Sequence, residues 1–145
     1  MINTKDDSIG RVSTDVELAN YDDLALARRG VIPPEQVRRL TVNGVVDTGA
    51  TFLVIPEDVA RQLGLPIVRR TKVSFADGRS TDRPVAGSVY LSWGGRSDVF
   101  SAIVEPGRDS VLLGAIVMEA LDLVVDCGRQ QLAPRDPEQT TAYIE

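Results

Sequence analysis

The sequence predicts a mainly β domain whose strands form a closed or nearly closed barrel. Short apolar runs, several of them alternating with polar residues, recur along the chain, and Gly, Pro, Asn and Asp separate them. Only two or three short stretches have the pattern of a helix. The length of 145 residues and the 43% of hydrophobic residues suit one domain with a substantial core.

The first elements are a strand and a capped helix. Residues 12–18 alternate between apolar and polar side chains, which is typical of a strand with one buried face. Asn20 can cap a short helix over residues 21–29, and Gly30 can end it.

A second strand leads into the most distinctive part of the chain. Residues 37–47 become wholly apolar just before Asp47. We interpret Asn43-Gly44 as a bulge, since a hairpin there would leave only a stub of strand before Asp47. Residues 56–63 then predict a short helix, with Pro in an early position and Gly64 as its stop signal.

The middle of the chain reads as antiparallel strands joined by turns. Asp77-Gly78 forms the core of one turn, and Gly94-Gly95 lies in another. We expect Phe52, Trp93 and Phe100 in the core. The strands of this region are expected at residues 67–75, 80–85, 89–93 and 99–104.

The last part of the chain repeats the alternation of strand and helix once more. Val111 to Gly114 reads as a buried strand ending in glycine. A short helix over residues 115–121, a strand over 123–126 and a turn follow, and the sequence beyond Pro134 is mostly polar.

Asp47 is the best candidate for chemistry. It lies between two apolar runs, Val45-Val46 and residues 52–55, where burying a carboxylate is costly unless hydrogen bonds compensate. The chain contains no histidine, so proton transfer near neutral pH must come from carboxylates. The ordinary reading of Asp47 is an aspartate that bonds to its own backbone at a strand end.

Composition excludes several other functions. Without histidine, the usual serine and cysteine triads and His-based zinc sites are absent, and we expect no metal and no cofactor. A net charge of −5 without a basic stripe argues against a nucleic-acid partner. No apolar run approaches the roughly 20 residues that span a membrane. With one cysteine and a polar N-terminus, we expect a cytoplasmic protein.

The order of three motifs resembles the retropepsin-like aspartic proteases, in particular their small bacterial and cyanobacterial members. Asp47-Thr48-Gly49-Ala50 matches the active-site signature, the Asp-Gly hairpin over residues 75–80 stands where the flap lies, and Leu112-Leu113-Gly114 matches the second signature. The resemblance implies a closed retropepsin-like β-barrel with one or two short helices. The domain would span residues 11–132, between a polar N-terminal segment, 1–10, and a C-terminal tail, 133–145.

The resemblance also implies an activity. Asp47 would be catalytic, supported in its loop by Thr48, Gly49 and Ala50. Two carboxylates that share one proton supply an acid and a base, so a homodimer would bring Asp47 of each subunit together. The chain would be an aspartic endopeptidase acting on a peptide or protein. The flap would close over an extended substrate through Ala76, Asp77, Gly78 and Arg79, and Leu112, Leu113 and Gly114 would pack beside the active-site loop.

Two differences from the viral members of the family, and one repeated sequence pattern, leave alternatives open. Viral members have an acidic residue where this chain has Thr51, and an arginine where it has Ala115. Loss of that arginine suggests an inactive peptide-binding or assembly module with the same fold. Val124-Val125-Asp126 echoes Val45-Val46-Asp47, so Asp126 could supply the second carboxylate within one chain, although a strand ending in a surface hairpin is the favoured interpretation.

Overall fold

The computed structural model describes residues 11–144; the predicted N-terminal segment, residues 1–10, lies outside them. Seven strands form one sheet in the order β1-β2-β7-β3-β6-β5-β4, and β1 also pairs with β5. The strands of this sheet are β1 (Val12–Asn20), β2 (Arg39–Val46), β3 (Leu53–Pro56), β4 (Ile67–Ser74), β5 (Ser80–Trp93), β6 (Arg96–Glu105) and β7 (Val111–Leu113). The additional pairing closes six strands into a barrel and leaves β4 outside it, so the predicted closed β-barrel is confirmed.

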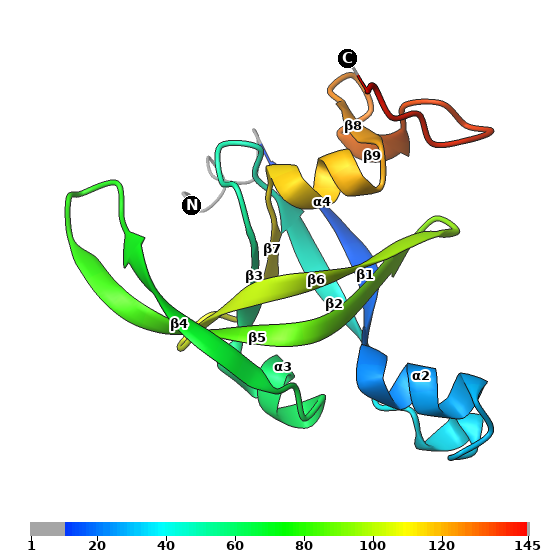
Figure 1. Cartoon of the computed structure of the whole chain (residues 1–145). Coiled ribbons are helices and arrows are strands. Elements are labelled where there is room, and N and C mark those ends of the chain that lie inside the picture. Colours follow the sequence, from blue (N-terminus) through cyan, green and yellow to red (C-terminus); the bar gives the residue numbers. More distant parts are fainter. Residues whose placement is uncertain (1–10, 145) are drawn as a thin grey trace.

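The remaining elements lie around the barrel (Figure 1). At one end, α4 lies beside a separate two-stranded sheet, and α2 lies at the other end. These elements are α2 (Tyr21–Arg28), the 3-10 turn η1 (Pro34–Gln36), α3 (Glu57–Gln62), α4 (Ala115–Ala120), β8 (Leu123–Asp126) and β9 (Gln131–Pro134). No helix in the described part of the chain is long and apolar enough to cross a membrane.

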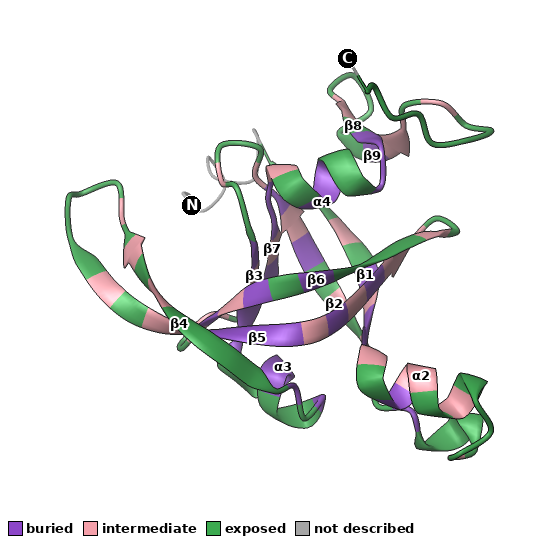
Figure 2. Ribbon diagram, in the orientation of Figure 1, coloured by how far each residue is buried: buried purple, intermediate pink, exposed green. Residues whose placement is uncertain are grey.

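The barrel is mixed, and its core follows from strand alternation. β2 and β7 run parallel, as do β3 and β6, whereas the other neighbouring strands are antiparallel. Alternate residues point inward, and Figure 2 shows buried segments along the barrel strands. The core includes the fully buried side chains Val16, Leu18, Leu53, Ile55, Leu91, Val111 and Leu113.

The expected bulge at Asn43-Gly44 is wrong. The pairing of β1 with β2 continues without a shift, from Asp15 opposite Asn43 to Thr14 opposite Gly44. Glycine at position 44 is explained by packing instead, because a Cβ there would lie 3.1 Å from Cδ1 of Leu113. The pairing of β5 with β6 does shift in register, between Ala86 and Val89. This shift lies within β5, a single strand for which the sequence predicts two.

The predicted cap of α2 is confirmed, and the same side chain joins the start of α2 to the end of α3. The Asn20 side chain accepts a hydrogen bond from the Asp23 N–H at 3.0 Å and donates one to the Leu63 carbonyl at 2.9 Å. Arg38 donates to both carboxylate oxygens of Asp23, which lowers the pKa of Asp23. The pair of Asp23 and Arg38 therefore joins the start of α2 to the residue just before β2.

Phe52 departs from the expected core. Phe100 is buried and Trp93 is half-buried, but the Phe52 side chain is 49% exposed. Phe52 lies just before β3, where the chain leaves the loop that contains Asp47. Its exposed ring therefore belongs to the surface next to that loop.

The chain beyond β8 is more ordered than its polar sequence indicates. β9 pairs with β8 along four residue pairs and buries Leu132. Asp122 then holds the last residues, since its carboxylate accepts hydrogen bonds from Arg135 Nε at 2.7 Å and from the Thr141 N–H at 2.9 Å. The hydrogen bonds to Asp122 and the burial of Leu132 thus attach this segment to the end of α4.

Candidate active site

Asp47 follows β2 directly and is held by backbone hydrogen bonds. Its N–H donates to the Leu113 carbonyl at 3.1 Å, and its carbonyl accepts from the Ala50 N–H at 3.1 Å. Its Oδ1 accepts from the Gly49 N–H at 3.0 Å, which fixes the direction of the carboxylate. The predicted site residues Asp47, Gly49 and Ala50 thus form one tight turn, in which the carboxylate remains half-exposed.

The strand with the second signature lies directly behind this turn. β7 pairs with β2 on one side and with β3 on the other, so Leu112 and Leu113 lie between the two strands that flank Asp47. The Ala115 N–H donates to Ala50 O at 2.8 Å, and the Ile116 N–H donates to Thr51 O at 2.9 Å. The start of α4 therefore holds the far side of the same loop.

At Gly114, the chain after β7 comes closest to the loop that contains Asp47. A Cβ at this position would lie 2.4 Å from the Phe52 carbonyl oxygen and 2.7 Å from the Thr51 carbonyl carbon. Both are backbone atoms, so the loop would have to move to admit any larger residue. The glycine after Leu112-Leu113 is therefore required by the contact between β7 and the loop of Asp47.

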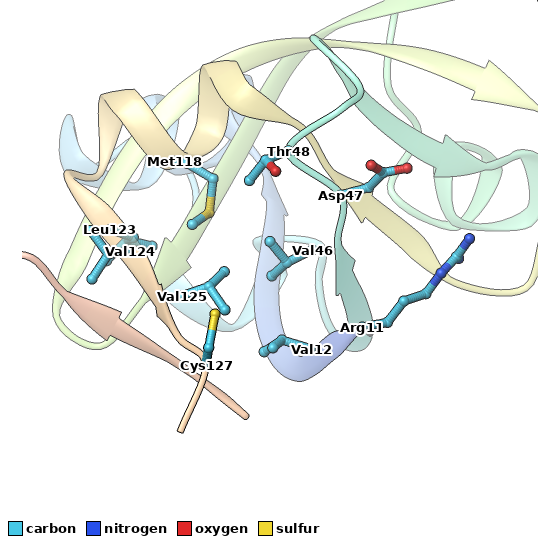
Figure 3. Close-up of a pocket in the computed structure, with 10 residues that line it drawn as sticks. All are labelled: Arg11, Val12, Val46, Asp47, Thr48, Met118, Leu123, Val124, Val125 and Cys127. Carbon is cyan, nitrogen blue, oxygen red and sulfur yellow. The ribbon is translucent and has the colours of Figure 1, made fainter. Parts of the chain in front are cut away.

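Asp47 and Thr48 line an open hollow of about 600 Å³ (Figure 3). Most of the other side chains in its walls are apolar. In Figure 3, Asp47 and Arg11 lie on one side of the hollow, and Met118 and β8 lie on the other. The lining residues are Arg11, Val12, Val46, Asp47, Thr48, Met118, Leu123, Val124, Val125 and Cys127.

Asp126 does not share this hollow, although its neighbours on both sides do. Its Oδ1 accepts a hydrogen bond from the Arg129 N–H at 3.2 Å, in the turn between β8 and β9. Asp126 therefore has the contacts of a strand-end aspartate. Within the walls of the hollow, Asp47 is the sole carboxylate among the residues that the structure describes.

The predicted flap residues lie elsewhere, at the tip of the β4–β5 hairpin, which extends beyond the barrel (Figure 1). Gly78 has a positive φ of 90°, and its N–H donates to the Phe75 carbonyl at 3.0 Å. The Arg79 backbone N–H and Nε both donate to Asp77, which lowers the pKa of this carboxylate. The Arg79 guanidinium also lies 5.2 Å from the centre of the Phe75 ring.

The hairpin tip and the hollow of Asp47 are separate. Phe75 and Arg79 line a second hollow with Arg83 and Glu105, whereas Ala76, Asp77 and Gly78 line neither. The structure thus brings Asp47, Thr48, Gly49 and Ala50 together with the second signature, but not with the hairpin tip.

Arg11 and Arg108 are cations near Asp47 that the sequence did not single out. Arg11 lines the hollow of Asp47. Arg108 lies in the loop between β6 and β7, where burial lowers its pKa and where Arg11 and Asp47 are among the charges that act on it. The antiparallel register of residues 12–18 with the strand before Asp47 could have located Arg11. The residues that the structure describes contain no group of three or more His, Cys, Asp or Glu that could hold a metal ion.

Comparisons with known proteins agree with this architecture. A family model described as aspartyl protease matches residues 35–117. Among solved structures, EIAV protease in complex with the inhibitor HBY-793 is similar at 17% identity and a TM-score of 0.52, covering 75% of this chain and 86% of that one. The simian foamy virus (mac) protease shares 18% identity over 54% of this chain and 80% of that one, with a TM-score of 0.43.

No curated protein matches the chain in sequence. The family match covers more than half of the chain and contains both the loop of Asp47 and the strand with Leu112-Leu113-Gly114. The chain therefore belongs to the aspartyl protease family and has the retropepsin-like fold.

Proposed function

We propose that the protein is an aspartic endopeptidase that hydrolyses peptide bonds in peptide or protein substrates. Its water would be activated between two Asp47 carboxylates, one from each subunit of a homodimer. One observation carries the proposal: the Asp47 carboxylate is oriented by the Gly49 N–H at the side of an open, mainly apolar hollow.

The reaction requires a second carboxyl group. The ionised carboxylate takes a proton from water while the oxygen of that water bonds to the peptide carbonyl carbon. The protonated carboxyl gives its proton to the carbonyl oxygen. When the tetrahedral intermediate collapses, the C–N bond breaks and the carboxyl that took the proton from water gives it to the leaving amine, while a hydroxyl of the intermediate returns its proton to the other carboxylate. Two carboxylates held about 3 Å apart share one proton, so one residue type fills both roles.

A second copy of the chain is the simplest source of the second carboxyl group. A two-fold axis brings the same surface of both subunits together, so an axis beside Asp47 would place it opposite its own copy. The surface around Asp47 suits protein contact, since Val124 is 38% exposed and Ile116 is 42% exposed. β8 pairs only with β9 in the part of the chain that is described, which leaves its outer edge open to a partner.

The β4–β5 hairpin would serve as the flap. An extended peptide can pair with a strand edge through its backbone, and pockets for alternate side chains then select the sequence. Ala76 to Arg79 would close over such a peptide, while Thr48 would join the two active-site loops across the axis. We assign the protease domain to residues 11–132 and place the protein in the cytoplasm, whose reducing conditions suit the exposed thiol of Cys127.

Replacement of Asp47 tests the proposal. Asp47→Asn keeps the shape and the hydrogen-bond acceptor but removes the ionisable group, so cleavage of a peptide library should fall to background. Asp126→Asn is the matched control and should cleave like the wild type. The far-ultraviolet circular dichroism of all three proteins should be the same. Cleavage by Asp47→Asn at an acidic pH would contradict the proposal.

A second candidate is an inactive module that binds peptides or assembles through the same surface. Ala115 favours it, because its side chain offers no hydrogen bond across a dimer interface, and its backbone N–H is already bound to Ala50 O. This candidate predicts either a monomer at micromolar concentration, with or without a peptide that mimics the transition state, or a dimer whose two Asp47 residues lie far apart. Sedimentation velocity distinguishes it from the homodimer.

A further inference from the structure

Arg11 lies opposite Asp47 at the end of the β1–β2 pair. These strands are antiparallel, with Val12 opposite Val46, so Arg11 and Asp47 form the next pair beyond the strands. Residues directly opposite in an antiparallel pair carry their side chains on the same face. In Figure 3, Arg11 and Asp47 both lie on the side of the hollow away from β8.

Arg108 lies in the loop just before β7, the strand whose Leu113 carbonyl accepts the Asp47 N–H. Its Nε donates to the Ser110 carbonyl at 2.7 Å, which fixes the guanidinium close to its own loop. Burial lowers the pKa of Arg108, and the charges that reach it are Asp109, Arg11, Glu105 and Asp47. Arg108 is therefore a partly desolvated cation within electrostatic reach of both Arg11 and Asp47.

Among residues 11–144, no carboxylate lies within ion-pair distance of Arg11 or Arg108. In residues 11–144, ion pairs within 4.0 Å involve seven other arginines, but neither Arg11 nor Arg108. Glu105 is already occupied, because both of its oxygens accept hydrogen bonds from Arg83 at 2.9 Å. Arg11 is exposed, whereas Arg108 is partly buried. A partly buried charge without a partner is costly, so a bound anion would reduce the cost of burying Arg108.

We propose that Arg11 and Arg108 select peptides that carry an aspartate or glutamate side chain close to the scissile bond. This inference rests on the proposed function, since it assumes that a peptide lies at Asp47. A carboxylate brought next to the negatively charged Asp47 pair would be repelled unless cations lay beside it. Two arginines present donors suited to a carboxylate.

Matched peptides test this selection. Each pair differs only by Glu or Gln at one position, taken in turn around the cleaved bond, and carries an amidated C-terminus, so that any charge effect comes from the side chain. The wild type should cleave the best Glu peptide roughly tenfold more efficiently in kcat/KM than its Gln partner, the size expected for a hydrogen bond to a charged group. A second set with free C-termini distinguishes a terminal carboxylate from a side chain.

Arginine variants identify the cations. Arg11→Gln and Arg108→Gln should each bring the Glu-to-Gln ratio close to one. Arg129→Gln is the matched control, because this exposed arginine lies in the turn after β8, and it should keep the ratio of the wild type. The wild-type ratio should also fall when ionic strength rises from about 0.1 M to about 1 M, because the charges are then screened.

Binding separates this inference from the proposed function. Fluorescence anisotropy with Asp47→Asn should show tighter binding of the Glu peptide, whether or not the wild type cleaves. Equal cleavage and equal binding of both peptides would overturn the inference and leave the protease intact. Preferential binding without cleavage by the wild type would support the inference and contradict the protease. If Arg11→Gln weakened the dimer and slowed both peptides equally, Arg11 would pair with the partner subunit, which also overturns the inference.

Discussion

At the scale of the residue, the site depends on two glycines at positions where a larger side chain would clash with its neighbours. Gly114 approaches the backbone of Phe52 and Thr51, and Gly44 makes room for Leu113. Because the Leu113 carbonyl accepts the Asp47 N–H, and Thr51 and Phe52 follow Asp47 in its loop, both glycines lie against residues that hold or form this loop. Glycine serves here by its small size, since neither residue has a positive φ.

Replacing Gly114 with alanine should destabilise the fold. The added Cβ would press on backbone atoms 2.4 Å away, so the loop of Asp47 must shift. Such overpacking costs about 1–3 kcal/mol, measurable as a lower midpoint in urea unfolding. Gly128→Ala is the control, because its Cβ would meet the nearest atom at an ordinary 3.5 Å. Equal midpoints for the two variants would contradict this account.

At this scale, a feature can be predicted from the sequence when it depends only on residues close together in the chain. Asn20 was identified as a cap because its side chain can replace a missing helical bond. Prediction failed where the partner was distant in sequence, since the bulge at Asn43-Gly44 was inferred without knowledge of Leu113. Arg11 and Arg108 were missed for the same reason, because their proximity to Asp47 arises only when β1, β2 and the loop before β7 come together.

At the scale of the element, one carboxylate makes several of the contacts that hold the segment after β9, beside a hydrogen bond from Arg96 to the Asp136 carbonyl. Asp122 ends α4 with a positive φ of 55° and binds both Arg135 and the Thr141 N–H. Arg135 in turn lies over the Tyr143 ring at 5.4 Å. Few sequence signals predict this arrangement, because the polar residues after Pro134 read as a loop.

Acid should release this segment. Hydrogen bonds from Arg135 and Thr141 lower the pKa of Asp122, so the bound state is favoured above the aspartate value of about 3.9 in the unfolded chain. This stabilisation is lost as the pH falls through the lower value in the folded state. Hydrogen exchange of the Thr141 amide, which donates to Asp122, should therefore accelerate below about pH 4, ahead of the barrel.

Asp122→Asn should produce the same release at neutral pH. Asparagine tolerates the positive φ, so the change removes the charge while keeping the backbone. Asp126→Asn, in the turn after β8, serves as the control and should leave the exchange of residues 135–144 unchanged. Full protection of this segment in Asp122→Asn would show that Leu132 and β9 hold it without the charge.

At the scale of the whole molecule, the sequence predicts a β-barrel more readily than it predicts which strands pair to close it. Short alternating strands predict a β-barrel, yet the pairing of β1 with β5 and the continuity of β5 through Gly87 and Ser88 depend on long-range register. The helices α2 and α3 were predicted because each has a start or stop signal of its own, such as Asn20 before α2 and Gly64 after α3. β9 was missed because one buried residue, Leu132, is too weak a pattern for a strand.

The proposed dimer makes a prediction at this scale. Val124→Asp places a charge in the wall of the hollow beside Asp47, so it should shift the protein to monomers in sedimentation and abolish cleavage. Val99→Asp is a matched control, since Val99 is 39% exposed and Val124 is 38% exposed, yet Val99 lies on β6 outside the hollow. Dimers of both variants would place the interface elsewhere on the molecule.

The hydrogen bonds behind Asp47 also determine when the site can exist. The loop of residues 47–51 is held by Leu113, Ala115 and Ile116, more than sixty positions further along the chain. During synthesis, a ribosome that has released only the first half of the protein exposes Asp47 without these partners. Contacts of such separation close late in folding. The loop that carries the carboxylate is thus held in place only after most of the polypeptide is complete, and a nascent or truncated chain lacks this support.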